Sequence, residues 1–345
     1  MNNSYPYGNN FYPGNGGQYQ SYNDHYVAFQ LRKQDEKRRL KKLSLLMGGA
    51  FLCYVLAQNV VVLIFELFGI MDIYRDNSIV STCIDVLLSV TCLLFPFMAF
   101  APKIKKISHS ENVYNFSAPH SFADSALAVA AGVGICMLAN VVTGFFTVFV
   151  GAFGMELTSP DISMPQGTTG VIVNIIRTVI VAAFVEEICL RGVVMGNLRH
   201  YGDKFAIMAS AVMFGIMHGN LIQSPFALIA GFALGYLSIK CGSLWVAVII
   251  HAINNGLSDL ISYMIDIVDE KFAMLIQFMI IYGLAFLGLI CFAVFSKRNK
   301  QHQLRQNSSL LSNSEMARAF IFTPTMIISL IYMVYITSNF IEFGG

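Results

Sequence analysis

The sequence predicts an all-α, polytopic membrane protein, a helical bundle of about eight to nine transmembrane helices. Hydrophobic residues make up 56% of the 345 residues and charged residues only 12%, and the mean hydropathy is +0.62. In soluble domains about a quarter of all residues are charged. Long apolar stretches separated by short polar ones are what a chain needs to cross a bilayer repeatedly.

The first 43 residues differ from the rest of the chain. Residues 1–26 are rich in Asn, Gly, Tyr and Gln, a composition that offers too little apolar surface for a core. We therefore expect a disordered tail over residues 1–43. It ends in the basic run RKQDEKRRLKK at residues 32–42, which we expect to anchor the chain at anionic lipid headgroups, with docking of a partner as the alternative.

Apolar stretches of roughly the length needed to span a bilayer follow this tail. Gly231 and Gly235, four residues apart, predict close packing of one of these helices against a neighbour. We group the helices into an N-terminal set (44–120), a core (121–264) and a C-terminal set (265–345). Nine spans are predicted, the fifth and sixth being the shortest, at residues 44–70, 79–100, 124–152, 170–196, 205–222, 225–240, 243–264, 272–295 and 319–341.

The distribution of basic residues predicts the orientation in the membrane. The segments on the side of the N-terminus carry the basic run and most other Lys and Arg residues between spans, whereas the opposite side holds only Arg75 and Lys271, beside acidic residues. Cytoplasmic loops are enriched in Lys and Arg. We therefore expect a cytoplasmic N-terminus and a C-terminus outside, in an integral protein that the Asn-, Tyr- and Gly-rich tail suggests belongs to a bacterial cell membrane.

Several ionisable residues fall inside the predicted spans. A charged side chain costs about 2.5–3.5 kcal/mol at mid-span on insertion scales, so such residues usually face the bundle interior and mark a functional site. The residues concerned are Arg177, Glu186, Glu187, Arg191, His218, His251 and Asp259.

Helical spacing separates the two adjacent glutamates. Glu187 and Arg191 are four residues apart and can pair on one face, whereas Glu186 points about 100° away and stays free. The same rule places Phe214 and His218 on one face of the next predicted helix.

A later span carries His251, Asn255 and Asp259 as one stripe. A rise of about 1.5 Å per residue places Glu186 about 15 Å, His218 about 20 Å and His251 about 10 Å from the cytoplasmic ends of their spans. An acid and two imidazoles thus reach similar depths. We expect Asp259, near the outer end, to lie outside the site.

Arg177 is expected to have a structural role. It lies nine residues before Glu186, which on a regular α-helix places the two side chains on opposite faces.

This set of side chains favours hydrolysis of an acyl bond. A carboxylate and an imidazole around one water can act as general base and then general acid. A second imidazole and a carboxamide can donate hydrogen bonds to the oxyanion of a tetrahedral intermediate. Glu186, His218 and His251 could instead hold zinc, since two His and one Glu are a known hydrolytic set. The HExxH arrangement is absent, and we expect no metal or other cofactor.

Three motifs in order carry a family resemblance: EEICLR (186–191), FGIMH (214–218) and HAINN (251–255). They resemble the EExxxR, FxxxH and HxxxN motifs of the CAAX protease and bacteriocin-processing family, which is similar to the type II CAAX prenyl endopeptidases. The match covers about residues 125–262. It implies an intramembrane protease core over residues 121–264. It also implies roles for its residues: Glu186 and His218 would activate water, His251 and Asn255 would form the oxyanion site, and Glu187, Arg191 and Phe214 would support them.

The resemblance implies a glutamate-dependent endopeptidase that cuts a membrane-associated, prenylated or bacteriocin-type peptide at the cytoplasmic side of the membrane or within its inner leaflet. Its partners would be a peptide or membrane-protein substrate and the lipid bilayer, with no nucleic acid. The alternative is a non-proteolytic protein of the same fold that confers bacteriocin self-immunity or acts as a membrane scaffold. A transporter would call for broken helices or inverted halves, which the sequence does not show.

Overall fold

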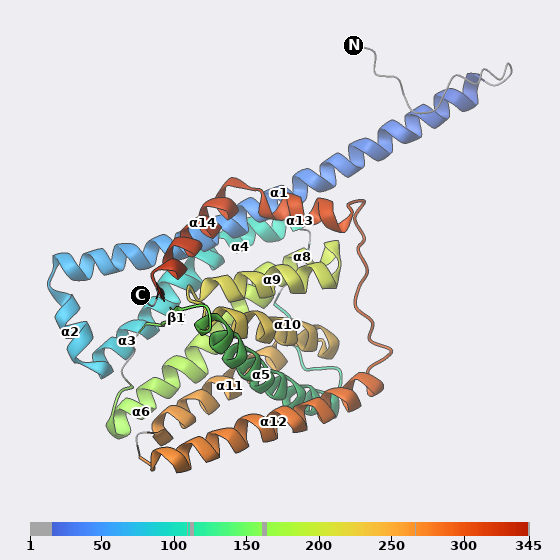
Figure 1. Cartoon of the computed structure of the whole chain (residues 1–345). Coiled ribbons are helices and arrows are strands. Elements are labelled where there is room, and N and C mark those ends of the chain that lie inside the picture. Colours follow the sequence, from blue (N-terminus) through green and yellow to red (C-terminus); the bar gives the residue numbers. More distant parts are fainter. Residues whose placement is uncertain (1–15, 109, 111–113, 161–163, 266, 344–345) are drawn as a thin grey trace.

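The structure is a computed structural model that describes residues 16–108, 110, 114–160, 164–265 and 267–343. It is a helical bundle with one two-stranded sheet (Figure 1). The helices and strands are α1 (Gly16–Leu67), α2 (Ile70–Asp76), α3 (Ser78–Leu88), α4 (Phe95–Ser108), α5 (Phe122–Gly151), β1 (Met155–Leu157), α6 (Gly167–Ile175), α7 (Ala183–Glu187), α8 (Gly196–Leu198), α9 (Asp203–Met217), α10 (Ser224–Cys241), α11 (Leu244–Ile265), α12 (Glu270–Arg298), α13 (Asn313–Ile321), α14 (Pro324–Ser338) and β2 (Ile341–Phe343).

The predicted polytopic membrane fold is confirmed, and the nine individual spans predicted reduce to seven or eight in the part of the chain that the structure describes. Within the described ranges, seven helices are long and apolar enough to cross a membrane, or eight if α13 and α14, bent by 74°, form one span. The predicted span at 205–222 is replaced by α9, which has only 15 residues. A helix of that length is about 22 Å long, less than the hydrocarbon core of about 30 Å. Nine spans is therefore an overcount.

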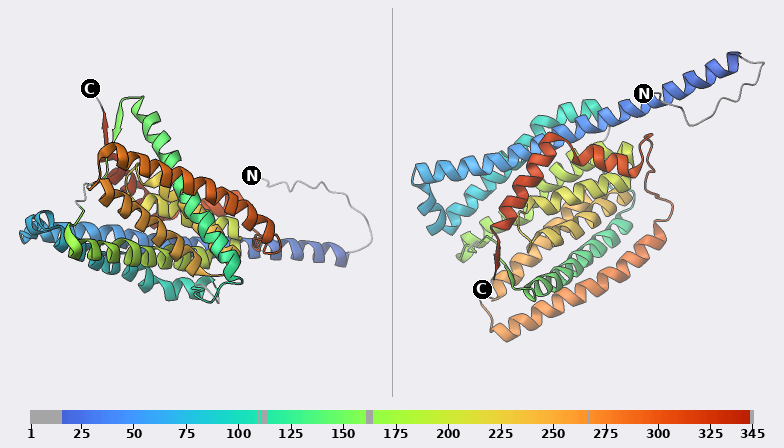
Figure 2. Two further views of the ribbon diagram at one scale, coloured as in Figure 1. Left: turned by 90° about the horizontal axis from the view of Figure 1, so that it is seen from below. Right: turned by 45° about the horizontal axis from the view of Figure 1, so that its top comes forward.

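The N-terminal segment corrects a second expectation. Residues 1–15 lie outside the described residues, but α1 begins at Gly16 and runs without a break through the basic run into the first span. The prediction of a disordered tail over residues 1–43 is thus wrong for residues 16–43. Its Gln, Lys, Glu, Arg and Leu residues between 30 and 46 are good helix formers, and the apolar span already supplies the costly nucleus. The N-terminal part of α1 extends beyond the bundle (Figure 2).

The basic residues gather at one end of the bundle, which we call the basic end. Arg39, near the end of the basic run, donates a hydrogen bond to the Ile107 carbonyl at 2.8 Å. Arg298 pairs with Asp124 at 2.6 Å, and the Lys240 ammonium donates to the Asn299 carbonyl at 2.8 Å. The opposite end, which we call the distal end, is formed by α2, the N-termini of α6 and α12, and the antiparallel pair β1–β2.

Close helix contacts depend on small residues. On α10, a Cβ at Gly231 would lie 3.0 Å from the Cα of Ala211 on α9, and one at Gly235 would lie 3.1 Å from the sulfur of Met195, just before α8. The close packing predicted for these two glycines is confirmed. Gly134 of α5 and Gly288 of α12 meet in the same way, because a Cβ on either would collide with the backbone of the other.

Gly134→Leu is therefore expected to destabilise the bundle by about 1–3 kcal/mol or more, because overpacking forces α5 and α12 apart. The matched control is Gly144→Leu on the same helix, where nothing lies within 4 Å of the added Cβ. Thermal unfolding in detergent, followed by circular dichroism, checks the difference. Equal midpoints for the two variants would contradict a close α5–α12 contact.

Candidate active site

The two motif glutamates lie in one continuous helical span, Gly167–Tyr201, which we call the motif helix. It consists of α6, α7 and α8 joined by two π-helical runs, Ile176–Ala182 and Ile188–Met195. π-helical turns inside α-helices are rare and occur mostly at functional sites. The short α7, which carries both glutamates, is thus held between two such runs.

These π-helical runs correct the position expected for Arg177. Arg177 and Glu186 line the same cavity, although regular α-helical spacing places them on opposite faces. The run Ile176–Ala182 lies between them, and a π turn takes more residues than an α turn. The helix phase therefore shifts, and the expectation that Arg177 faces away from Glu186 is wrong.

Glu187 belongs to a fully buried ionic cluster. Its Oε1 accepts hydrogen bonds from Arg191 Nη1 and from His251 Nδ1, both at 2.9 Å. The side chains of Glu187 and Arg191 are 0% exposed. The Glu187–Arg191 pair predicted from spacing is present, and His251 completes a buried triad that links the motif helix to α11.

Phe214 of α9 packs against this triad. The Arg191 guanidinium lies over its ring, 4.5 Å from the centroid, which adds a cation–π attraction to the buried charge. The rings of His218 and His251 also meet Phe214 edge-on, with centroids 5.0 and 5.6 Å away. One aromatic ring therefore contacts both histidines and the arginine.

Glu186 has a different environment from its neighbour. Its side chain is 18% exposed and lines a cavity of about 670 Å³. Its Oε2 is buried and accepts no hydrogen bond from any described residue. His251 Nε2 lies 3.7 Å from this oxygen. Because this oxygen accepts no hydrogen bond from the described residues, the Glu186 carboxylate can still accept a proton or a hydrogen bond from a small molecule.

His218 lines the same cavity. It is the C-cap of α9, and Gly219 after it adopts a positive φ of 66°, which ends the helix there. His218 Nδ1 lies 2.8 Å from the Phe214 carbonyl. Because a carbonyl only accepts, Nδ1 carries the hydrogen, and Nε2 of the neutral ring is left as an acceptor.

Asn255 and Asp259 point elsewhere. The Asn255 amide donates to the Thr178 carbonyl at 2.9 Å, and the Thr178 hydroxyl donates to Asp259. Neither residue is among those that line the cavity. Both side chains tie α11 to the first π-helical run of the motif helix.

Besides Arg177, the cavity is lined by polar side chains that the sequence did not single out. Arg177 Nη1 pairs with Asp85 of α3 at 3.3 Å, and the Tyr74 hydroxyl donates to the same carboxylate at 2.8 Å. Burial, followed by the proximity of Asp85, raises the pKa of Tyr74 to about 12, so Tyr74 keeps its proton. Tyr54 and Gln58 of α1 complete this polar lining.

The described residues contain no group of three or more His, Cys, Asp or Glu side chains that could hold a metal ion. Glu186, His218 and His251, the set named for the metal alternative, are not such a group. His251 instead uses Nδ1 to bond Glu187.

Residues 168–257 match the family model of the type II CAAX prenyl endopeptidase Rce1-like proteins. This segment is therefore similar to the Rce1-like domains. The match confirms the resemblance to the CAAX protease family and contains all three motifs. The comparison with curated proteins gave no match, and neither did the comparison with solved structures.

The walls of the cavity reach beyond the Rce1-like domain. Tyr54 and Phe65 belong to α1, and Met333 and Ile336 belong to α14. None of these positions lies in a motif. The sequence of a helix that is apolar on all sides does not indicate which face points into the bundle. The helices outside the matched segment therefore help to enclose its site.

Proposed function

We propose that the chain is an intramembrane endopeptidase that hydrolyses a peptide bond with a water activated by Glu186 and His218. The Rce1-like domain supports protease activity in general. The observation that carries the proposal is that Glu186 and His218 line one cavity, while Oε2 of Glu186 accepts no hydrogen bond from the described residues.

The reaction follows from these positions. A water in the cavity donates a hydrogen bond to Glu186 and another to His218 Nε2, and Glu186 removes a proton as the water oxygen bonds to the carbonyl carbon. The tetrahedral intermediate then collapses, the C–N bond breaks, and the same proton passes to the leaving amine nitrogen. The products are a carboxylic acid and an amine, and transfer of the second water proton from the acid to the amine leaves a carboxylate and an ammonium group.

His251, protonated on both ring nitrogens, is the proposed donor to the oxyanion. Its Nε2 lies 3.7 Å from Glu186 Oε2, so it is close to the reacting carbonyl, and preorganised donors of this kind stabilise the developing charge. The bond from Nδ1 to Glu187 holds the ring in place. The Asn255 amide donates to the Thr178 carbonyl instead. We therefore propose that Asn255 positions α11 and does not bind the oxyanion.

The proposed substrate is a membrane-associated peptide or a segment of a membrane protein, and the proposed location is a bacterial cell membrane. Prenylated and bacteriocin-type peptides are the classes to test first. The polar cavity enclosed within apolar helices suits a peptide presented by the bilayer.

Cleavage of such peptides by the purified chain in liposomes, followed by mass spectrometry, tests the function. His218→Gln is expected to lower kcat by about 100-fold or more, as for loss of a general acid–base group, whereas Glu270→Gln at an exposed position on α12 is expected to leave it unchanged. Activity is expected to persist in a chelator. Loss of activity on chelation would assign the hydrolysis to a metal, and full activity of His218→Gln would reject this site.

If wild type cleaves no peptide yet protects cells from a bacteriocin, and Glu186→Ala and His251→Ala variants protect equally well, the chain is an immunity or scaffold protein instead.

A further inference from the structure

We propose that the substrate reaches Glu186 and His218 from the extracytoplasmic side of the membrane, as a peptide segment that enters the cavity at the distal end of the bundle. This inference rests on the proposed function, because it concerns access to the same site. It differs from the expectation of cleavage at the cytoplasmic side.

The cavity runs from the distal end to the catalytic groups. Its lining includes Phe65 near the end of α1, Tyr74 of α2, Pro160 of the segment after β1, and Phe340 just before β2. All four lie at the distal end, as the labels of Figure 1 show for α2, β1 and the C-terminus. Among the residues of the motif helix that line the cavity, Glu186 lies farthest along the chain from Gly167 at the distal end.

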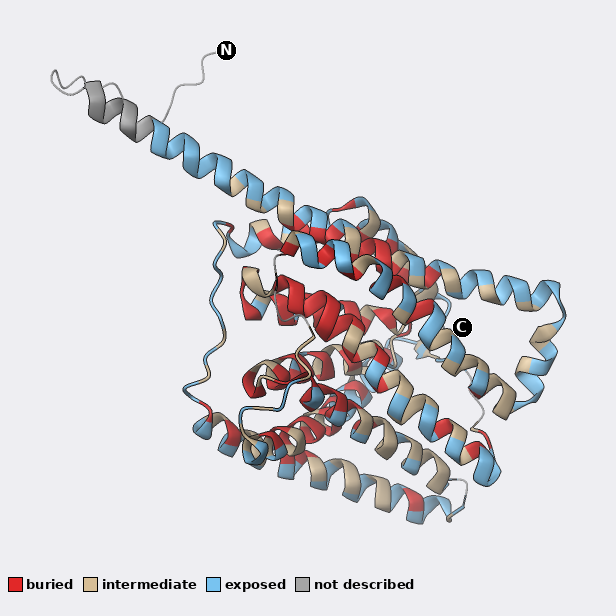
Figure 3. Cartoon of the chain, turned by 180° about the vertical axis from the view of Figure 1, so that it is seen from behind, coloured by how far each residue is buried: buried red, intermediate tan, exposed pale blue. Residues whose placement is uncertain are grey.

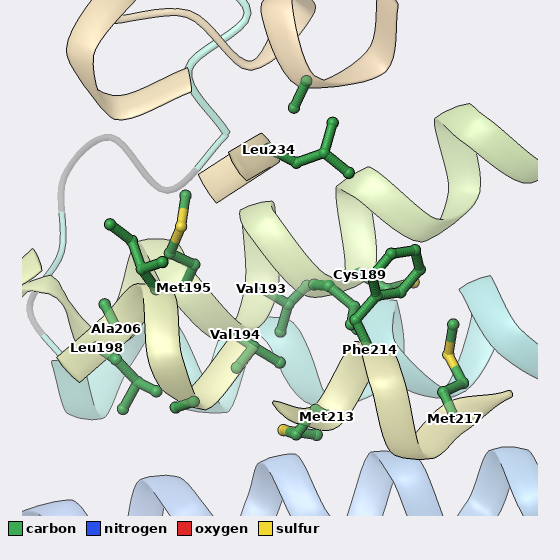
Figure 4. Packing of buried hydrophobic residues seen from close by; sticks show 14 of the residues in the cluster. Cys189, Val193, Val194, Met195, Leu198, Ala206, Met213, Phe214, Met217 and Leu234 are labelled. Carbon is green, nitrogen blue, oxygen red and sulfur yellow. The ribbon is translucent and has the colours of Figure 1, made fainter. Parts of the chain in front are cut away.

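The path from the basic end is closed. Beyond Glu186, the motif helix continues into side chains that are fully buried, including Leu190, Val193, Val194 and Leu198, all 0% exposed. Figure 4 shows Val193, Val194 and Leu198 packed with residues of α9 and α10. The buried residues lie mainly on this side of the bundle, whereas the motif helix toward Gly167 is largely exposed or half-buried (Figure 3). Close-packed interiors leave no room for a peptide.

The short α9–α10 hairpin explains why the cavity opens on one side only. α9 starts at the basic end and stops at His218, after about 22 Å, and α10 returns from Ser224. The hairpin therefore turns within the membrane. No residue of α9 or α10 therefore fills the distal part of the bundle. Gly219 and Gln223, in the turn between the two helices, line the cavity.

The lining chemistry favours a peptide over a lipid tail. A peptide main chain needs hydrogen-bond partners when it leaves water, and Gln58, Asp85, Arg177 and Gln223 can supply them. Arg177 Nε is buried and donates to no described residue. A second groove of about 790 Å³, between α5, α11 and α12, is lined almost entirely by apolar side chains and suits hydrocarbon instead.

The basic end identifies the two sides. Lys and Arg are enriched on the cytoplasmic side of membrane proteins, and the basic run, Arg199, Lys240 and Arg298 all lie at the basic end. The distal end, where the cavity opens, is therefore extracytoplasmic.

Thiol labelling tests this access. In a background with Cys53→Ala, Cys83→Ala and Cys291→Ala, which removes the cysteines that are not buried, single cysteines are placed at Ser89 in the cavity and at Ser210 in the packed layer. Asp76→Cys at the distal end and Gln301→Cys at the basic end are exposed reference positions. A membrane-impermeant methanethiosulfonate reagent is then added to right-side-out or inside-out vesicles.

Ser89→Cys is expected to react in right-side-out vesicles together with Asp76→Cys, and to lose labelling in inside-out vesicles, where Gln301→Cys reacts. Ser210→Cys is expected to react in neither. Labelling of Ser89→Cys from the side of Gln301→Cys, or from neither side, would overturn the proposal, as would reaction of Asp76→Cys in inside-out vesicles only.

Labelling needs no catalysis, so its outcome is separate from that of the proposed function. A chain that cleaves peptides but is labelled from the cytoplasmic side keeps the function and loses this inference. A chain labelled from outside that cleaves nothing loses the function. Cleavage of an impermeant peptide by right-side-out but not inside-out vesicles is the second expected result.

Discussion

Glu186→Gln is expected to lower kcat for peptide cleavage by about 100- to 10,000-fold, the range for removal of a general base. Glutamine keeps the shape of the side chain but cannot take a proton from water. Because Glu186 Oε2 accepts no hydrogen bond from the described residues, the fold should not depend on its charge. The expected thermal unfolding midpoint is therefore close to that of wild type.

Initial rates at saturating peptide, together with thermal unfolding by circular dichroism, check this prediction. The matched control is Glu270→Gln, which makes the same chemical change at an exposed position of α12. A Glu186→Gln variant that cleaves at the wild-type rate would remove Glu186 from the reaction. A variant that is inactive only because it unfolds would assign the residue a structural role.

Glu187→Ala is expected to produce the opposite result, a loss of folding. Glu187 Oε1 accepts from both Arg191 and His251, and the side chains of Glu187 and Arg191 are 0% exposed. Removing the carboxylate leaves the Arg191 charge buried with only the Gly231 carbonyl, at 3.4 Å, and the Phe214 ring. Breaking one partner of a buried ion pair costs about 3–5 kcal/mol.

The yield of monodisperse protein and the unfolding midpoint measure this loss. A Glu187→Leu, Arg191→Met double variant removes both charges and should recover most of the stability, since apolar residues of similar volume often replace a buried pair without cost. If Glu187→Ala were as stable as wild type, or if the double variant were less stable than the single one, the triad would not be an energetic unit.

The two neighbouring glutamates show how much helical spacing can predict about side-chain contacts. Spacing alone paired Glu187 with Arg191 and left Glu186 free, because residues four apart share a face over a single turn whatever follows. The same spacing failed for Arg177, since nine residues cross a π-helical run and the error in phase accumulates. Side-chain pairs within one helical turn are thus predictable from spacing. Whether two residues several turns apart share a face depends on whether the turns between them are α or π.

His251 shows a second limit. Its spacing from Asn255 and its depth in the membrane placed His251 near the other motif side chains. They did not predict that Nδ1 would bond Glu187 while Nε2 lies near Glu186. That choice depends on how α11 crosses the motif helix, which is set by packing among many apolar residues. The expected disorder of residues 16–43 failed for a related reason, because α1 is nucleated by the adjoining span.

The sequence by itself determined the membrane fold class, the three motifs and the residues able to do acid–base chemistry, because hydropathy, charge and i,i+4 spacing are local properties of the chain. Only the tertiary structure decided that both motif histidines contact the ring of Phe214, and that α1 and α14 line a cavity that extends to the distal end. These features depend on helix lengths, crossing and phase, which arise from contacts between segments more than 100 residues apart, such as Tyr54 and His218 in one cavity.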